Sequence, residues 1–180
     1  AHSGILIRDA EALERMEAID TLVIDKTGTL TEGKPKVVKV IAAPGFDENE
    51  LLRVAASVER ASEHPLALAV VNAANERKLA IDDVSGFASP SGTGAIGKVG
   101  GRTVALGNAM LMGEVGIDTG PLDVSAETAR QDGATAIFVA VDGRIAGVVA
   151  IADPVKPSAS GALAALRAEG LCIVMLTGDN

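Results

Sequence analysis

The sequence contains very few aromatic side chains: three Phe and neither Trp nor Tyr among 180 residues. A packed core therefore has to be built from Ala, Val, Leu and Ile, and an apolar content of 48% is high enough for one. The single cysteine, Cys172, excludes an internal disulfide and is typical of a reducing compartment. No apolar run reaches the ~18 residues that a membrane-spanning helix needs.

Basic residues are also scarce, because 16 Lys and Arg stand against 24 Asp and Glu and leave a net charge of −8 at pH 7. A surface of this sign repels nucleic acids and anionic membranes. We therefore expect no nucleic-acid partner. The length of 180 residues allows one large domain or two small ones.

The most informative stretch is residues 25–31, Asp-Lys-Thr-Gly-Thr-Leu-Thr. It follows the apolar residues 22–24, which predict a short buried strand, so Asp25 stands where a strand ends. In open α/β sheets ligands bind at this edge. Gly28 allows a tight turn whose N–H groups can surround an anion, and Lys26 adds positive charge. The stretch predicts phosphoryl transfer to Asp25, although the short Asp-x-Thr-Gly pattern alone would also fit an ordinary Asp/Gly turn.

A second apolar run, residues 171–176, predicts another buried strand that ends at Thr177. We expect it to share a parallel sheet with the strand before Asp25. Between the two lie hairpin signals at Gly100-Gly101 and Asp142-Gly143. The sequence thus predicts an α/β fold: an incomplete Rossmann-like parallel-sheet domain, residues 1–33 and 150–180, with an inserted α+β domain, residues 34–149, built on an antiparallel sheet.

Helix signals recur along the chain. Asp47 and Glu50 have the spacing of a capping box, and Pro65 suits the first position of the next helix. A short helix is expected over residues 108–115, and Ser125 is expected to cap another that runs to residue 130 or 131.

Residues 92–98, Gly-Thr-Gly-Ala-Ile-Gly-Lys, match parts of two phosphate-binding patterns. Both patterns need a helix directly afterwards, and a P-loop also needs Ser or Thr where this chain has Val99. Because a Gly-Gly hairpin signal follows instead, we predict a glycine-rich turn between strands rather than a P-loop.

Residues 25–31 match the phosphorylation motif of the P-type ATPases, and the chain resembles this family from end to end. GILIRDAEALE, DKTGTLTEGKP, SEHPLA, ADPVKP and MLTGDN occur in the family's order. SEHPL is typical of the heavy-metal subgroup, and GILIRDAEALE is most like its copper-transporting members. The resemblance implies a whole nucleotide-binding domain and part of a haloacid-dehalogenase-like phosphorylation domain, itself soluble, on the cytosolic face of a membrane transporter.

The resemblance implies two sets of site residues. The catalytic set is Asp25, Lys26, Thr27, Thr177, Gly178 and Asp179, of which Asp25 and Thr27 would supply part of a Mg²⁺ site. The ATP-contacting set is Glu59, His64, Gly92, Gly94 and Asn108. From the residues alone, the favoured interpretations are a helix-start residue before Pro65 for His64 and a solvated helix face for Glu59.

Thr27 stands where related phosphatases usually carry a second Asp as acid/base. Because a threonine cannot activate water as a carboxylate can, the resemblance implies a phospho-aspartate that persists and drives ion transport, with Cu(I) export as the expected activity. The family's later catalytic lysine and magnesium-binding carboxylates would follow residue 180, so these residues alone are not expected to turn ATP over. The expected partners are ATP and the rest of the transporter: the remaining phosphorylation-domain segment, the membrane helices and the actuator domain. A soluble haloacid-dehalogenase-type phosphatase and a non-catalytic nucleotide-binding module are the alternatives.

Overall fold

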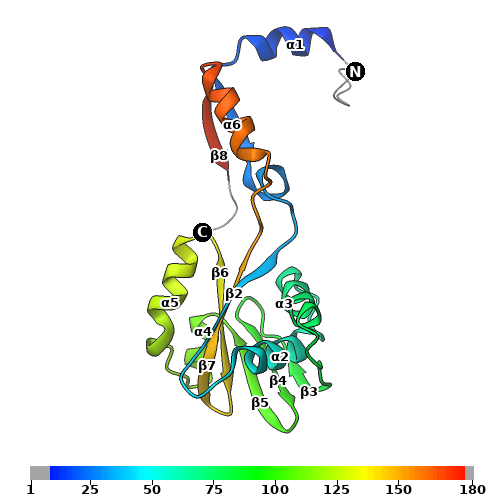
Figure 1. The fold of residues 1–180 in the computed structure, drawn as a ribbon, viewed down its shortest axis with the longest axis vertical. Coiled ribbons are helices and arrows are strands. Elements are labelled where there is room, and N and C mark those ends of the chain that lie inside the picture. The colour runs from blue at the N-terminus through cyan, green and yellow to red at the C-terminus, as the bar shows by residue number, and fades with distance from the viewer. Residues whose placement is uncertain (1–8, 177–180) are drawn as a thin grey trace. The chain divides into compact units, whose positions relative to one another are not determined.

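The computed structural model describes residues 9–176 and divides them into two compact units (Figure 1). The first unit combines the residues up to Gly33 with those from Val155 onward, and the second contains Lys34–Pro154. The second junction lies inside the Pro-containing segment 153–157, whereas the expected boundary at residues 149 and 150 falls within strand β7 (Arg144–Ala152).

The first unit pairs two strands in parallel, β1 (Thr21–Asp25) and β8 (Cys172–Leu176), with Asp25 opposite Leu176. It also contains helix α1 (Ala10–Glu17), the irregular turn η1 (Lys26–Leu30) and helix α6 (Ala159–Ala168). The parallel pairing was predicted, but the prediction that both strands are buried is wrong, because Val23 is 53% and Leu176 is 58% exposed. A two-stranded sheet with one crossover helix cannot cover its own apolar faces.

The second unit is built on an antiparallel sheet of six strands in the order β2-β7-β6-β5-β4-β3. The other strands are β2 (Lys36–Ala42), β3 (Val84–Ala88), β4 (Gly94–Val99), β5 (Arg102–Gly107) and β6 (Thr135–Val141). The helices are α2 (Glu48–Glu59), α3 (Pro65–Glu76), α4 (Ala109–Glu114) and α5 (Gly120–Gln131). The predicted hairpins at Gly100-Gly101 and Asp142-Gly143 join β4 to β5 and β6 to β7.

The sheet has a separate core on each face. Along β5, Val104 and Leu106 pack with α2 and α3, whereas Ala105 packs with α4 and α5 on the other face. This alternation follows from the period of two along a strand. Phe138 is the one aromatic residue buried to 1% exposure, so the core depends on small and branched aliphatic side chains, as predicted. Figure 1 shows α2 and α3 on one side of the sheet and α5 on the other.

Local signals set most helix starts. The Asp47 side chain accepts hydrogen bonds from the N–H groups of Asn49 and Glu50 at 2.9 and 3.0 Å, which confirms it as the cap of α2. Helix α3 begins at Pro65, also as predicted. The prediction that Ser125 starts a helix is wrong, since α5 begins at Gly120. Pro in its first turn needs no N–H partner there and starts the helix earlier.

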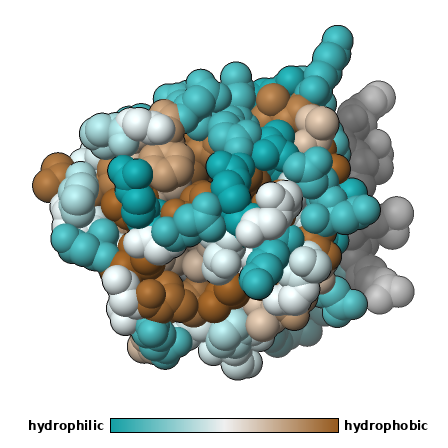
Figure 2. Space-filling view, turned by 90° about the horizontal axis from the view of Figure 1, so that it is seen from below, coloured by the Kyte–Doolittle hydropathy of each residue, from teal (hydrophilic) through white to brown (hydrophobic). Residues whose placement is uncertain are grey.

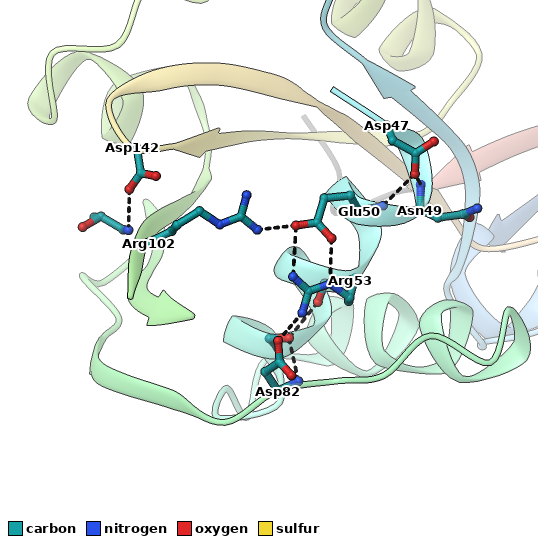
Figure 3. A network of polar contacts seen from close by, with 9 residues as sticks. Asp47, Asn49, Glu50, Arg53, Asp82, Arg102 and Asp142 are labelled. Carbon is teal, nitrogen blue, oxygen red and sulfur yellow. Dashed lines mark hydrogen bonds and ion pairs between the residues drawn. The ribbon is translucent and has the colours of Figure 1, made fainter. Parts of the chain in front are cut away.

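An ion-pair network fixes α2 to its neighbours (Figure 3). Arg53 Nε donates to Glu50 at 2.7 Å, Arg53 also pairs with Asp82, and Arg102 of β5 pairs with Glu50. The bond from Arg53, supported by Arg102, lowers the pKa of Glu50 to about 2 against the opposing effect of burial. The buried Ser57 hydroxyl accepts from the Asp82 N–H at 3.1 Å. The network therefore ties the first half of α2 to Asp82 and to β5, and Ser57 adds a contact to Asp82 from the second half.

The surface of the second unit is mixed. Figure 2 shows hydrophilic side chains interspersed with smaller hydrophobic patches on the face seen from below. Leu68, Met110 and Val124 are the most exposed large apolar side chains described in this unit, and they lie on three different helices. Within residues 9–176 no helix combines the length and apolarity that crossing a membrane requires.

Candidate functional site

The second unit contains a cavity of about 430 Å³, a size that suits a small-molecule ligand. The cavity lies where the α2–α3 junction, the β3–β4 turn, the β5–α4 junction and the start of β6 meet. Its lining includes all five residues predicted to contact nucleotide: Glu59, His64, Gly92, Gly94 and Asn108. The fold thus brings together residues that are up to 49 positions apart in the chain (108 minus 59).

Glu59 is the last residue of α2 and is only 8% exposed. Burial raises the pKa of its carboxyl, while a hydrogen bond with Ser62 acts in the opposite direction. The alternative of a solvated helix face is therefore wrong. A carboxyl with a perturbed pKa in a cavity is typical of a ligand-binding group.

His64 caps α3, because its Nδ1 accepts a hydrogen bond of 3.2 Å from the Leu66 N–H. The backbone N–H of His64 donates to the Ser62 hydroxyl oxygen at 3.2 Å. The helix-start role considered for His64 is thus confirmed, and it leaves room for a second role. Since Nδ1 is the acceptor, the neutral ring carries its proton on Nε2, which stays available as a donor towards a ligand.

The two glycines of the β3–β4 turn are needed for different reasons. Gly92 has φ +75° and open space around it, so it supplies a left-handed backbone conformation. Gly94 is required by close contact: an added Cβ would lie 2.0 Å from the Leu106 oxygen and 2.6 Å from Gly107 Cα. The segment from Gly94 continues as strand β4 into a hairpin, which confirms that this is not a P-loop.

Asn108 connects the turn to α4. Its backbone N–H donates to the Thr93 oxygen at 2.9 Å, and its side chain bonds both Gly92 and the first turn of α4. Sequence reasoning did not identify the hydroxyl groups that complete the lining, which are those of Ser62, Ser89, Ser91, Thr93 and Thr135. Ser62 lies inside SEHPL and could have been found from it. Thr135 joins the cavity only through the tertiary structure.

The first unit carries Asp25 at the carboxyl end of β1, where it is exposed. The Asp25 loop, residues 25–31, turns through Gly28, which has φ +75°. The Gly28 N–H donates to Thr31 Oγ1 at 3.0 Å, and the Thr31 N–H donates to the Lys26 oxygen at 3.2 Å. Lys26 and Thr27 belong to this loop as predicted, whereas Thr177, Gly178 and Asp179 lie outside the described residues.

Sequence reasoning missed two residues that hold the Asp25 loop. Thr31 is 2% exposed and forms a β-bridge with Val155. Lys156 donates from Nζ to the Gly28 oxygen at 2.8 Å and from its N–H to the Leu30 oxygen at 2.8 Å. The family motif ADPVKP contains Lys156 and was the available signal.

The Mg²⁺ site implied by the family is not complete in this structure. The part of the chain that the structure describes contains no group of three or more His, Cys, Asp or Glu side chains that could hold a metal ion. Asp25 offers one carboxylate and Thr27 one hydroxyl, whereas Mg²⁺ prefers six oxygen ligands. A Mg²⁺ ion held by these two residues would therefore need further ligands.

Comparison with known proteins gives one family and several similar chains. Residues 19–180 match the haloacid dehalogenase-like hydrolase family. The whole chain is 52% identical to a silver exporting P-type ATPase of Salmonella typhimurium and 50% identical to a copper-transporting P-type ATPase of Rhizobium leguminosarum bv. viciae. It covers 22% and 21% of these relatives and so spans about a fifth of their length.

Solved structures of P-type ATPases are also similar to this chain. A zinc-transporting PIB-type ATPase in its E2.Pi state superposes with a TM-score of 0.84 at 34% identity, covering 97% of this chain and 28% of that one. The catalytic domain of a CPx-ATPase, studied for conformational changes upon nucleotide binding, gives a TM-score of 0.72 at 31% identity, covering 99% of this chain and 60% of that one.

Proposed function

Because this chain belongs to the haloacid dehalogenase-like hydrolase family and is similar over its whole length to one region of heavy-metal P-type ATPases, we propose that it is the nucleotide-binding and phosphorylation region of such a transporter. The observation that carries the proposal is the convergence of Glu59, His64, Gly92, Gly94 and Asn108 on one cavity. In the parent protein this region would lie on the cytosolic side of the membrane.

The cavity of the second unit binds the nucleotide. His64 donates from Nε2, and Glu59 accepts from the adenine amino group. The turn at Gly92 and Gly94 lets the backbone approach the ligand closely, because neither position carries a Cβ. Burial of Glu59 strengthens its hydrogen bond to the base, since little water competes for the carboxyl.

The Asp25 loop of the first unit receives the phosphoryl group. A carboxylate oxygen of Asp25 attacks the γ-phosphorus of ATP, the bond between that phosphorus and the β-phosphate oxygen breaks, and ADP leaves. Asp25 and Thr27 would hold part of the coordination shell of a Mg²⁺ ion, which would lower the charge of the ATP phosphates. Thr27 provides no carboxylate to activate water, so the phospho-aspartate persists.

The transported substrate is a soft monovalent cation, and we propose Cu(I). The relatives named above export silver or transport copper, and both ions form strong bonds with sulfur ligands. The chain spans about a fifth of the length of these relatives, and we propose that the ligands of the transported ion lie in the remainder of the parent.

Phosphorylation of a full-length transporter that contains this chain tests the proposal. Incubation with γ-labelled ATP should give an acid-stable phosphoenzyme, and Asp25→Asn should abolish it. Glu32→Gln, in an exposed residue after the loop, serves as the matched control and should retain the label. Labelling that persists in Asp25→Asn would contradict the proposal. Rapid release of phosphate from small phosphomonoesters would favour a soluble phosphatase instead.

A further inference from the structure

Lys156 lies far from the Asp25 loop in the sequence but contacts it directly in the first unit. Its Nζ donates to the Gly28 carbonyl oxygen at 2.8 Å, across 128 positions of the chain. The neighbouring backbone is fixed independently, because the Lys156 N–H donates to the Leu30 oxygen at 2.8 Å and Val155 pairs with Thr31. The ammonium group therefore adds one specific contact to a segment that is already docked.

Both sides of Gly28 are held. Its N–H donates to Thr31 Oγ1 at 3.0 Å, and its carbonyl accepts from Lys156. In a trans peptide the carbonyl of one residue and the N–H of the next point in opposite directions. By fixing the Gly28 carbonyl, Lys156 also fixes the direction of the Thr29 N–H. At a glycine with φ +75°, the peptide could otherwise rotate at little steric cost.

We infer that Lys156 is a positioning residue for phosphoryl transfer: it holds the Gly28–Thr29 peptide, and with it the direction of the Thr29 N–H, in the loop that receives the phosphate. This inference rests on the proposed function of Asp25. The ammonium also places a positive charge on the loop, which favours an anion bound there. Lys156 acts through the peptide and does not itself touch the phosphate.

The substitution Lys156→Met removes only the ammonium contact. Methionine keeps the length of the aliphatic stem, and both backbone contacts of the segment remain. In the full-length transporter we expect the rate of phosphorylation to fall at least tenfold, on the order of one lost charge-assisted hydrogen bond. The Kd for ATP should stay within twofold of the wild type, because the cavity belongs to the other unit.

Lys156→Arg, which retains a cationic donor, should recover most of the rate. Lys39→Met, in an exposed lysine of β2, is the control for loss of charge.

Two results would overturn the inference. One is a phosphorylation rate in Lys156→Met within twofold of the wild type. The other is an equal loss of rate and ATP affinity that Lys156→Arg does not restore, because the residue would then act on nucleotide binding or on the whole fold.

Amide hydrogen exchange of the 180-residue chain separates this inference from the proposed function. In Lys156→Met the N–H groups of Gly28 and Thr31 should exchange at least tenfold faster, while Lys39→Met leaves them unchanged. If the wild-type transporter forms no phosphoenzyme, the proposed function fails. Exchange then still decides whether Lys156 orders the loop, and unchanged exchange in Lys156→Met would overturn the inference.

Discussion

The side-chain amide of Asn108 donates a hydrogen bond of 3.1 Å to the carbonyl oxygen of Gly92, sixteen positions earlier in the chain. The Oδ1 atom of the same side chain accepts from the Leu111 N–H at 3.1 Å and so caps α4. Asn108 thus connects the β3–β4 turn to the start of α4 in the cavity wall. Its amide nitrogen bonds the turn, and its amide oxygen bonds the helix. Its contribution to ligand binding therefore includes holding Gly92 in place.

Substitution of Asn108 should separate these two tasks. Asn108→Asp keeps an oxygen that caps α4 but cannot donate to Gly92 when ionised, whereas Asn108→Ala loses both bonds. We expect Asn108→Asp to weaken ATP binding by about 1–2 kcal/mol with little change in the melting temperature. Asn108→Ala should weaken binding similarly and also cost about 1 kcal/mol of stability. Titration calorimetry measures the ATP affinity of both variants, and thermal unfolding measures their stability. An equal loss of stability in the two variants would argue against separate roles for the two ends of the Asn108 amide.

The two ring nitrogens of His64 should have separable roles: Nδ1 caps α3, and Nε2 is the proposed donor to ATP. Asn is among the preferred helix caps, and its Oδ1 can take the place of Nδ1, but it has no donor equivalent to Nε2. His64→Asn is therefore expected to leave the stability of the chain nearly unchanged while it weakens ATP binding by about 1–3 kcal/mol. Lys98→Ala, in an exposed residue of β4, should change neither quantity. A larger loss of affinity in Lys98→Ala than in His64→Asn would reopen the P-loop interpretation.

The two glycines of the turn should respond differently to alanine. At Gly94 a Cβ would collide with the Leu106 oxygen at 2.0 Å, so Gly94→Ala has to displace backbone and should cost about 3 kcal/mol or more. At Gly92 the space is open, and only the left-handed φ of +75° opposes alanine, at about 1–2 kcal/mol. Urea unfolding of the two variants gives the comparison. A greater cost at Gly92 would mean that backbone conformation, not close contact, limits the turn.

Glu59 should make stability depend on pH. Because burial raises the pKa of Glu59 in the folded chain above its ordinary value, the folded state binds this proton more tightly than the unfolded state. The stabilisation that comes from this tighter proton binding is fully present below the ordinary carboxyl pKa. It is lost as the pH rises through the raised pKa of Glu59. Glu59→Gln should therefore melt at a higher temperature than the wild type at pH 7, with the difference vanishing in acid. Glu76→Gln, in an exposed residue of α3, should show no such trend. A wild-type advantage at pH 7 would contradict the direction of the shift.

Some features could be predicted because they depend on neighbouring residues. The hairpins at Gly100-Gly101 and Asp142-Gly143, the Asp47 cap and the Pro65 helix start all follow from local backbone chemistry. The Ser125 helix start failed for a similar reason, because a better local signal stood at Pro121. The Asp25 loop was recognisable from seven consecutive residues. These are cases in which a short segment carries its own conformational preference.

By itself, the sequence determined the family, the antiparallel and parallel halves of the fold, and the residues proposed for the two sites. Only the tertiary structure decided that Glu59 is buried, that Thr135 reaches the cavity, that β1 and β8 remain partly exposed, and that Lys156 holds the Gly28 carbonyl. Each of these depends on which segments pack together across long stretches of chain. Burial, a perturbed pKa and a hydrogen bond between distant residues arise from that packing, and no local pattern of residues encodes them.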